Sequence, residues 1–193
     1  MRPAVFLDRD GTLIEERGYL DRIEQLEVFP WAPDAIRLLN RAGFAVVVVT
    51  NQSGIGRGMF DESFVGELHA AIDARLAAGN ARIDRYYFCP HHPDAVLERY
   101  RQVCRCRKPG SGMIEQACRD LEIDLQRSVM VGDKWVDVAC GRAAGTRGVL
   151  VRTGYGADHE TRPPAGARAD AILDNLMEAV GWTLRTFSGS STR

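Results

Sequence analysis

The chain has 193 residues, of which 45% are hydrophobic and 26% charged, and its formal net charge is −1 at pH 7. These values are those of one ordinary globular domain with room for a small insertion. The near-neutral charge excludes a general nucleic-acid binder, and no apolar run approaches the roughly 20 residues of a membrane span. No secretory signal precedes the first predicted strand, so we expect a cytoplasmic protein.

The first predicted strand is the apolar run Val5-Phe6-Leu7, which is followed directly by Asp8 and Asp10. Aspartate is a poor strand residue, so both acids are expected at the carboxyl edge of a sheet, where open α/β sheets bind ligands. Two carboxylates this close are costly to ionise together without a cation. The pair therefore predicts an active site with a metal ion or a shared proton; the alternative is an acidic turn after an edge strand.

The rest of the chain alternates between helical and strand patterns. In order, we expect a helix over 33–42, a strand over 44–50, a glycine-rich loop over 51–58, a helix over 62–78, a strand over 83–88, a helix over 110–121, a strand over 128–133, a helix over 136–144, a strand over 148–151, a loop over 153–170, a short strand over 171–173 and a helix over 175–186. This alternation predicts an α/β fold with a parallel sheet and helices on both faces. Residues 1–187 are expected to form a single domain, and residues 188–193 a flexible tail.

The loop after the second predicted strand has the spacing G-x-G-x-G, which differs from the dinucleotide-binding fingerprint. No Walker Lys-Ser/Thr pair occurs, so an NTP-binding P-loop is excluded. Thr50 and Asn51 are instead expected to donate hydrogen bonds to phosphate oxygens.

Polar groups thus gather where four segments reach one edge of the sheet: Asp8 and Asp10, Thr50 and Asn51, Lys108, and Asp133. Their order resembles the four motifs of the haloacid dehalogenase-like (HAD) superfamily of phosphatases, over nearly the whole chain. The resemblance implies a Rossmann-like core without a large cap domain. Asp137, which also belongs to the fourth motif, either supports a metal site or a helix turn, or binds the metal directly.

The chemistry of phosphate-ester hydrolysis assigns a role to each group. Asp8 would be the nucleophile that forms an aspartyl phosphate, and Asp10 the general acid and base. Mg²⁺ would be held by the carboxylate of Asp8, the backbone carbonyl of Asp10 and the carboxylate of Asp133. Thr50 and Lys108 would hold the transferring phosphoryl oxygens; their alternatives are a strand-end threonine and a surface lysine.

A second cluster consists of Cys89, His91, Cys104 and Cys106. Three thiolates and one imidazole suit tetrahedral Zn²⁺, and a site filled by four protein ligands is structural. His92 is the alternative imidazole, but His91 repeats the one-residue spacing of the Cys-x-Cys pair. The zinc would tie down loop 89–108, which ends in Arg107 and Lys108; the alternative is three free thiols in a flexible loop. Cys118 and Cys140 are expected to be buried in helices.

Within the superfamily, four segments are similar to the D-glycero-D-manno-heptose 1,7-bisphosphate 7-phosphatase family: FLDRDGT at 6–12, TNQSGIGRG at 50–58, CPHHP at 89–93 and CRCRKP at 104–109. The resemblance implies removal of the 7-phosphate in nucleotide-heptose synthesis. It implies substrate contacts with Glu16, Arg17, Gly18, Tyr19, Asn51, Gln52, Ser53, Arg107 and Lys134. Of these, Arg107 and Lys134 are cations suited to a second phosphate.

Two other functions compete with this one. Histidinol-phosphate phosphatases share both motifs, but their zinc loop is typically shorter than the twelve residues between His91 and Cys104. A zinc-stabilised binding module without catalysis would have no need of four charged groups at one buried edge. We therefore expect a monomeric enzyme with a small sugar bisphosphate substrate and with no nucleic-acid or membrane partner.

Overall fold

The structure, a computed structural model, describes residues 1–188. Its strands are β1 (Ala4–Leu7), β2 (Ala45–Asn51), β3 (Arg85–Cys89), β4 (Val129–Gly132), β5 (Arg147–Val151) and β6 (Ala171–Leu173). They form one six-stranded sheet in the order β3-β2-β1-β4-β5-β6, and every neighbouring pair is parallel. The predicted parallel α/β sheet is confirmed, and so is its short last strand.

The helices are α1 (Ala32–Arg41), α2 (Ser53–Gly56), α3 (Glu62–Ala77), α4 (Gly112–Leu121), α5 (Trp135–Ala144), α6 (Gly156–Thr161) and α7 (Leu176–Ser188). Three 3₁₀ turns add to them: η1 (Ile23–Gln25), η2 (Glu98–Tyr100) and η3 (Leu125–Arg127). Ser188 ends α7, so the first residue of the predicted tail is helical, and the rest of that tail lies outside the described residues. Among the described residues, no helix has the length and apolarity needed to cross a membrane.

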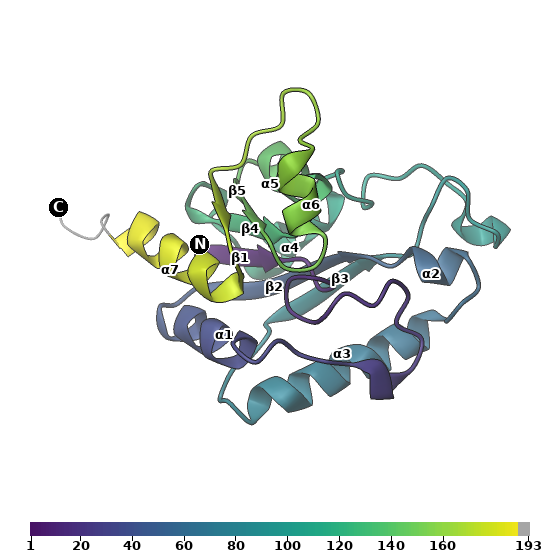
Figure 1. Cartoon of the computed structure of the whole chain (residues 1–193), viewed down its shortest axis with the longest axis horizontal. Coiled ribbons are helices and arrows are strands. Elements are labelled where there is room, and N and C mark those ends of the chain that lie inside the picture. Colours follow the sequence, from purple (N-terminus) through teal and green to yellow (C-terminus); the bar gives the residue numbers. More distant parts are fainter. Residues whose placement is uncertain (189–193) are drawn as a thin grey trace.

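Helices cover both faces of the sheet (Figure 1) because its strands are apolar on both faces. In β1, Val5 and Leu7 pack with α1, α3 and α7, whereas Ala4 and Phe6 pack with α4 and α5. Successive side chains of a strand point to opposite faces, so β1 belongs to both cores. The central strand is therefore held rigidly on both sides.

The sheet has its topological switch point between β1 and β4. From β1 the chain proceeds outward through β2 to β3, and it then returns to the other side of β1 to form β4. The connections that leave the carboxyl ends of β1 and β4 diverge there, which leaves a crevice. The long segments 8–31 and 90–111 both start from this edge of the sheet.

Two predicted loops contain short helices that the sequence pattern did not predict. They are α2 within loop 51–58 and α6 within loop 153–170. Tertiary contacts explain α6: a Cβ on its first residue, Gly156, would lie 1.7 Å from the carbonyl oxygen of Val151. A glycine-rich stretch that looks irregular is thus packed tightly against the end of β5.

Candidate active site

A cavity of about 360 Å³ opens at the switch point. All four predicted catalytic residues line it, together with eight of the nine predicted substrate contacts: Asp8, Asp10, Thr50 and Lys108, with Glu16, Gly18, Tyr19, Asn51, Gln52, Ser53, Arg107 and Lys134. Arg9, Leu20, Gly54, Phe60, Val136, Asp137 and Tyr155 complete the lining. Residues from both halves of the chain thus meet in one cavity.

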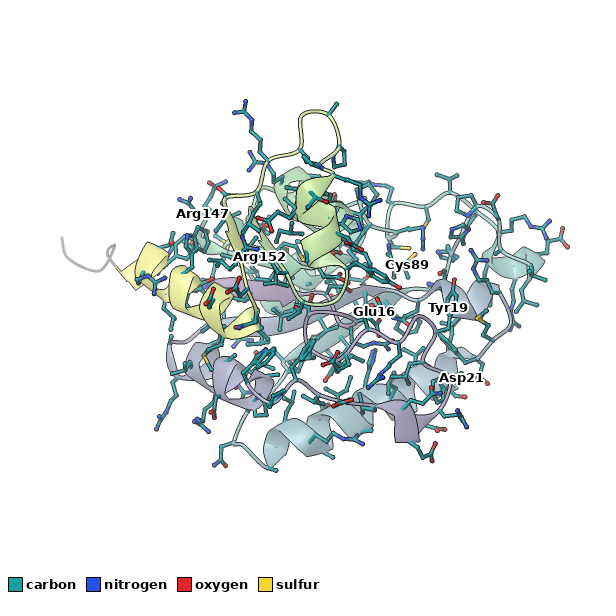
Figure 2. The ribbon with its side chains drawn as sticks, in the orientation of Figure 1. Glu16, Tyr19, Asp21, Cys89, Arg147 and Arg152 are labelled. Carbon is teal, nitrogen blue, oxygen red and sulfur yellow. The ribbon has the colours of Figure 1, made fainter. Side chains whose placement is uncertain are left out.

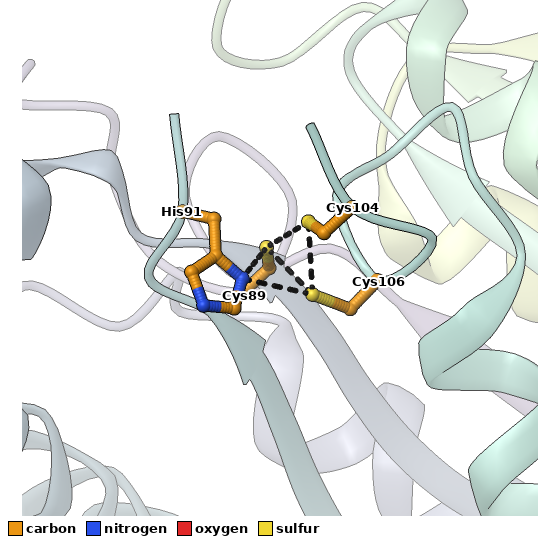
Figure 3. Close-up of side chains that lie close together, drawn as sticks. All are labelled: Cys89, His91, Cys104 and Cys106. Carbon is orange, nitrogen blue, oxygen red and sulfur yellow. Dashed lines mark hydrogen bonds between the residues drawn. The ribbon is translucent and has the colours of Figure 1, made fainter. Parts of the chain in front are cut away.

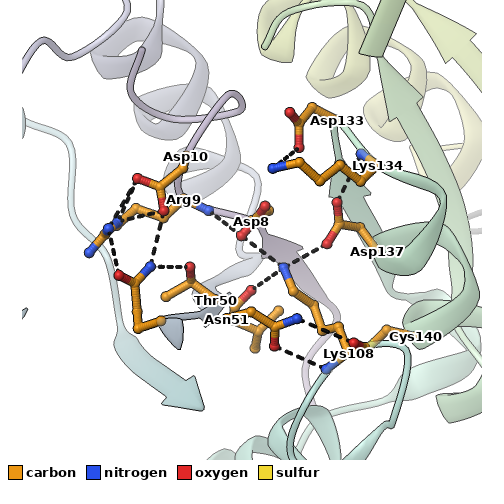
Figure 4. Close-up of polar contacts among 12 residues, drawn as sticks. Asp8, Arg9, Asp10, Thr50, Asn51, Lys108, Asp133, Lys134, Asp137 and Cys140 are labelled. Carbon is orange, nitrogen blue, oxygen red and sulfur yellow. Dashed lines mark hydrogen bonds and ion pairs between the residues drawn. The ribbon is translucent and has the colours of Figure 1, made fainter. Parts of the chain in front are cut away.

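Lys108 joins two carboxylates at the floor of this cavity (Figure 4). Its Nζ lies 2.8 Å from Asp8 Oδ1 and 2.6 Å from Asp137 Oδ1, and it donates to the carbonyl of Val49 at 2.9 Å. The side chain is only 2% exposed. Burial works against its charge, but Asp137 and Asp8 outweigh burial and raise the pKa of Lys108. The lysine is therefore a fixed cation beside Asp8.

Asp8 is held at the end of β1 by backbone and side-chain donors. Its own N–H donates to the carbonyl of Val131 in β4, and the N–H of Arg9 donates to Asp8 Oδ1 at 2.8 Å. Burial opposes its charge, but Lys108 and Lys134 outweigh burial and lower the pKa of Asp8. The group is thus kept as a carboxylate, which is the nucleophilic form.

Asp133, Asp137 and Asp8 place carboxylate oxygens within 4.8 Å of one another; with Lys108 we call them the carboxylate–lysine cluster. Asp133 is fully buried, and its Oδ2 accepts from the N–H of Tyr155 at 2.9 Å. Among the described residues, its Oδ1 accepts no hydrogen bond. Burial and the charge of Asp8 raise the pKa of Asp133 to about 8. This Oδ1 faces Lys134 Nζ at 3.7 Å. A carboxylate oxygen that accepts no hydrogen bond, beside two more carboxylates, is a donor set that fits Mg²⁺.

Two glycines make the close packing around Asp133 possible. Gly11 and Gly154 both have positive φ, and a Cβ on either would lie 2.4 Å from Asp133 Oδ2. The loops after β1 and β5 therefore meet directly against this carboxylate. A side chain at either position would displace it.

Asp137 completes a helix turn, which is one of the roles that the sequence left open; its support of a metal site stays a prediction. Its Oδ2 accepts from the N–H of Lys134 at the start of α5, whereas its Oδ1 faces Lys108. Burial raises the pKa of Asp137 to about 6, with Lys108 opposing the shift. The residue completes a helix turn and contributes a charge to the site.

The second acid, Asp10, contacts Arg9 and Gln52. Arg9 Nε lies 3.2 and 3.3 Å from the two Asp10 oxygens, and its Nη2 lies 3.0 Å from Oδ1. Gln52 Nε2 donates to Asp10 Oδ2 at 3.0 Å. Sequence reasoning did not assign Arg9 a role, although its place between the two acids was a signal.

The polar groups at the end of β2 differ in part from expectation. Asn51 was expected to donate to phosphate, but its amide brackets the backbone of Lys108: Oδ1 accepts from the Lys108 N–H at 3.0 Å and Nδ2 donates to the Lys108 carbonyl at 3.2 Å. Gln52, expected to contact substrate, donates to Thr50 Oγ1 and Asp10 and accepts from Arg9. Both amides line the cavity, but both are engaged by neighbouring residues.

The loop after β1 borders the cavity, and Figure 2 labels Glu16, Tyr19 and Asp21 along it. Glu16 Oε2 lies 3.1 Å from Lys134 Nζ, which also lies 4.7 Å from the ring centroid of Tyr155. Burial opposes the charge of Lys134, but Asp133, Asp8 and Glu16 outweigh it and raise the pKa of Lys134.

Arg17 was expected to contact substrate, but it does not line the cavity, and its substrate contact stays a prediction. Its guanidinium pairs with Glu27, and both side chains are more than half exposed. Arg17 lies within a turn of this loop, in which the N–H of Gly18 donates to Glu16 Oε1. The side chain of Arg17 therefore contacts Glu27 while Glu16 contacts Lys134.

Cys89, His91, Cys104 and Cys106, here called the thiol–imidazole cluster, converge beside the active site (Figure 3). Their Sγ atoms lie 2.9 to 3.5 Å apart, and His91 Nδ1 lies 3.4 Å from Cys106 Sγ. His92 turns elsewhere and accepts from the N–H of Asp94. Of the two other cysteines, Cys140 is buried as expected, whereas Cys118 is only half-buried.

The thiol–imidazole cluster and Lys108 are mechanically connected. Cys89 pairs with Asn51 in the register of β3 and β2, and Asn51 brackets the backbone of Lys108. Cys106 lies only two residues before Lys108, and Arg107 Nη1 donates to the carbonyl of His91 at 3.2 Å. Order in the cluster therefore constrains the segment that carries Lys108.

Comparisons with known proteins agree with this geometry. The family model described as HAD-hydrolase-like matches residues 105–179. The solved heptose 1,7-bisphosphate phosphatase of B. bronchiseptica, complexed with magnesium and phosphate, superimposes with a TM-score of 0.83 at 30% identity and covers 96% of this chain and 99% of its own. A putative HAD-like phosphatase from Mesorhizobium loti gives a TM-score of 0.82 at 33% identity, over 96% of this chain and 87% of its own.

The curated relatives are more similar in sequence. The D-glycero-beta-D-manno-heptose-1,7-bisphosphate 7-phosphatase of Escherichia coli (strain K12) is 46% identical over 178 residues, which is 91% of this chain and 91% of that protein. The Haemophilus influenzae protein of the same name is 43% identical over 182 residues, which is 92% of this chain and 95% of its own.

Fold, site and relatives together define the class: this chain is a HAD-like phosphatase, a phosphoric monoester hydrolase. This confirms the enzyme prediction over the non-catalytic binding module. The chain belongs to the D-glycero-beta-D-manno-heptose-1,7-bisphosphate 7-phosphatase family.

Proposed function

We propose that this enzyme hydrolyses the 7-phosphate of D-glycero-β-D-manno-heptose 1,7-bisphosphate through an aspartyl phosphate. The observation that carries the mechanism is Asp8, a buried carboxylate at a strand end that Lys108 contacts at 2.8 Å inside the cavity. The names of relatives that are up to 46% identical to this chain support the proposed substrate and its β anomer. Nucleotide-heptose synthesis is the pathway that this reaction would serve.

In the first step, Asp8 forms a bond to phosphorus while the bond between phosphorus and the sugar oxygen breaks. The leaving oxygen takes its proton from Asp10. In the second step, water attacks phosphorus, gives a proton to Asp10, and the acyl phosphate bond breaks to release phosphate and restore Asp8. Lys108 and Thr50 hold the phosphoryl oxygens in both steps.

The substrate carries a second phosphate, for which Arg107 and Lys134 are the proposed cations. Glu16, Gly18, Tyr19 and Ser53 are the proposed contacts to the sugar, since they border the same cavity. Asn51 and Gln52 have supporting roles in this proposal, because Asn51 holds the backbone of Lys108 and Gln52 donates to Asp10.

Mg²⁺ fits this site because, among the described residues, Asp133 Oδ1 accepts no hydrogen bond and two more carboxylates lie beside it. The proposed ligands are Asp8, Asp133 and the backbone carbonyl of Asp10. When bound, the ion would screen the repulsion between Asp8 and the phosphate. Lys108 meanwhile holds Asp137, which keeps that carboxylate paired with a cation.

Zn²⁺ fits the thiol–imidazole cluster, in which three sulfur atoms and one ring nitrogen converge without a disulfide. Four protein ligands fill a tetrahedral site, so the proposed zinc is structural. Its function would be to order loop 89–108 and thereby Arg107 and Lys108. We further propose that residues 1–187 form one domain; the cytoplasmic location and the monomeric state stay predictions.

The decisive experiment measures phosphate release, with Mg²⁺, from both anomers of the heptose bisphosphate and from histidinol phosphate. It compares the wild type with Asp8→Asn. Much faster turnover of the β anomer, abolished in Asp8→Asn, would support substrate and nucleophile together. Preference for histidinol phosphate would refute the proposed substrate, and activity that survives in Asp8→Asn, with deamidation excluded, would refute the mechanism.

A further inference from the structure

Arg9 is a buried cation whose contacts do not follow from phosphate binding. Its side chain is 2% exposed, among the most buried in the molecule, although it carries a full charge. A buried charge is retained only where it is paired and hydrogen-bonded. Arg9 spends three of its contacts on the two oxygens of Asp10 and a fourth on Gln52 Oε1 at 3.0 Å.

Gln52 closes this arrangement into a ring. Its Nε2 donates to Asp10 Oδ2 at 3.0 Å and to Thr50 Oγ1 at 2.8 Å, while its Oε1 accepts from Arg9. Both sides of the Asp10 carboxylate are thus fixed, one by a guanidinium and the other by an amide. Side chains that converge on one carboxylate in this way leave it little freedom of orientation.

The turn after β1 makes this contact possible between consecutive residues. The carbonyl of Arg9 accepts from the N–H groups of Thr12, Leu13 and Ile14, which folds the segment back on itself. Asp10 and Arg9 are thereby brought to the same side. The arginine of the Asp-Arg-Asp sequence thus points under the active site instead of toward solvent.

Two aromatic rings lie beneath Arg9. His69 of α3 is buried and stacks on Tyr86 with ring centroids 4.2 Å apart, and the Tyr86 hydroxyl donates to Asp73. Burial and the charge of Arg9 lower the pKa of His69 to about 3, so the ring is uncharged at neutral pH. Among the described residues, the ion pair of Arg9 is with Asp10.

We propose that Arg9 is a positioning residue that, with Gln52, fixes the orientation of Asp10 for its proton transfers. The proposal rests on the proposed function, in which Asp10 protonates the leaving oxygen. Arg9 also lines the cavity, but its contacts are with Asp10 and Gln52, so it acts through Asp10 and not on phosphate. Its effect should therefore depend on whether the leaving group needs a proton.

The test compares kcat/KM for the heptose bisphosphate with kcat/KM for 4-nitrophenyl phosphate, whose leaving group departs without protonation. We expect Arg9→Met to lower the sugar value by about 10- to 100-fold, at most the lower end of the roughly 100- to 10,000-fold that general acid–base catalysis contributes, and the aryl value by less than about 3-fold. Arg9→Lys, which keeps the charge but loses the fork, should fall in between. Equal losses on both substrates would overturn the proposal.

A double-mutant cycle supplies a second readout. Because Arg9 acts through Asp10, adding Arg9→Met to Asp10→Asn should lower the sugar kcat/KM by less than about a further 3-fold. Multiplied losses would refute the proposal even if 4-nitrophenyl phosphate were not turned over. Tyr86→Phe is the matched control in the same buried layer, since it removes a hydrogen bond to Asp73 and leaves the Asp10 contacts intact.

If Arg9→Met does not fold, Gln52→Met removes the amide side of the ring while leaving the Arg9–Asp10 pair in place. We expect the same substrate-dependent loss from it, and equal losses would again count against the proposal. If another alkyl phosphate proved to be the substrate, the proposed function would fail. The same comparison on that phosphate would still decide the role of Arg9.

Discussion

The described part of the chain has two clusters of potential metal ligands, and they are built in opposite ways. The three carboxylates of the carboxylate–lysine cluster lie at the ends of β1 and β4 and on α5, and Lys108 already neutralises part of their charge at 2.6 and 2.8 Å. The thiol–imidazole cluster joins the end of β3 to a segment without regular structure at 104–106. The first is therefore preorganised by the backbone, whereas the second depends on its proposed ion to hold loop segments together.

The largest effect is expected from Lys108→Met, which removes the cation of the carboxylate–lysine cluster. Phosphate release should fall by about 100- to 1,000-fold because a donor to the phosphoryl oxygens is lost. Two buried carboxylates lose their partner, so the free energy of unfolding should fall by about 3–5 kcal/mol in urea denaturation with EDTA. Lys134→Met, at a side chain that is 28% exposed, should destabilise less. A Lys108→Met variant as stable as the wild type would contradict the preorganised description.

The next effect is expected from Cys106→Ser in the thiol–imidazole cluster. Bound zinc, measured by metal analysis, should fall well below one ion per chain, and limited proteolysis should cut within loop 89–108. Activity should drop by about 10-fold or more because Lys108 is no longer ordered. Cys118→Ser is the matched control, since Cys118 lies outside the cluster. Full zinc content and activity in Cys106→Ser would refute the dependence on zinc.

Asn51→Ala tests the connection between the two clusters. Asn40 provides an unusual control, because its amide brackets the backbone of Arg82 as Asn51 brackets Lys108: it donates to the carbonyl and accepts from the N–H. Each alanine variant should lose about 1–2 kcal/mol of unfolding free energy. Only Asn51→Ala should also lose activity, by about 10-fold, because only the amide of Asn51 holds the backbone of Lys108 in place. Equal kinetics in the two variants would show that Asn51 does not connect the thiol–imidazole cluster with Lys108.

The smallest effect is expected from Arg17→Ala. Its guanidinium pairs with Glu27 at the surface, and such pairs contribute about 0–1 kcal/mol. KM for the heptose bisphosphate should therefore stay within about 2-fold of the wild-type value, whereas Lys134→Met should raise it more, since Lys134 lines the cavity. A large KM effect at Arg17 would show that the loop after β1 rearranges around substrate.

Sequence reasoning worked where the backbone pattern determines position. The β-branched strand over 44–50 and the acids after the first and fourth strands could be located from the periodicity alone, because parallel strands place their carboxyl ends at one edge. It could not determine which neighbours the polar side chains contact. The substrate contacts of Asn51 and Gln52 stay predictions, and only the fold shows that Lys108, Asp10 and Arg9 lie within reach of the two amides.

The short helices α2 and α6 were not predicted from the sequence for a related reason. Helix α2 is half glycine, and neither α2 nor α6 is long enough to show a helical periodicity, so packing against the rest of the chain decides their structure. The burial of Arg9 was not predicted because a charged residue beside a strand end normally faces water. Here the turn after β1 carries it inward.

The position of β1 has a consequence for how the protein is made. One neighbour, β2, leaves the ribosome soon after β1, but the other is β4, and the N–H of Ala4 donates to Ser128, 124 residues further along the chain. Until that segment is synthesised, one edge of a fully apolar strand has no native partner, which exposes it to wrong pairing. The pairing of β4 with β1 also brings Asp133 next to Asp8. The active site is therefore incomplete until the core has formed. The enzyme becomes active only once the apolar edge of β1 is covered and the most aggregation-prone period has ended.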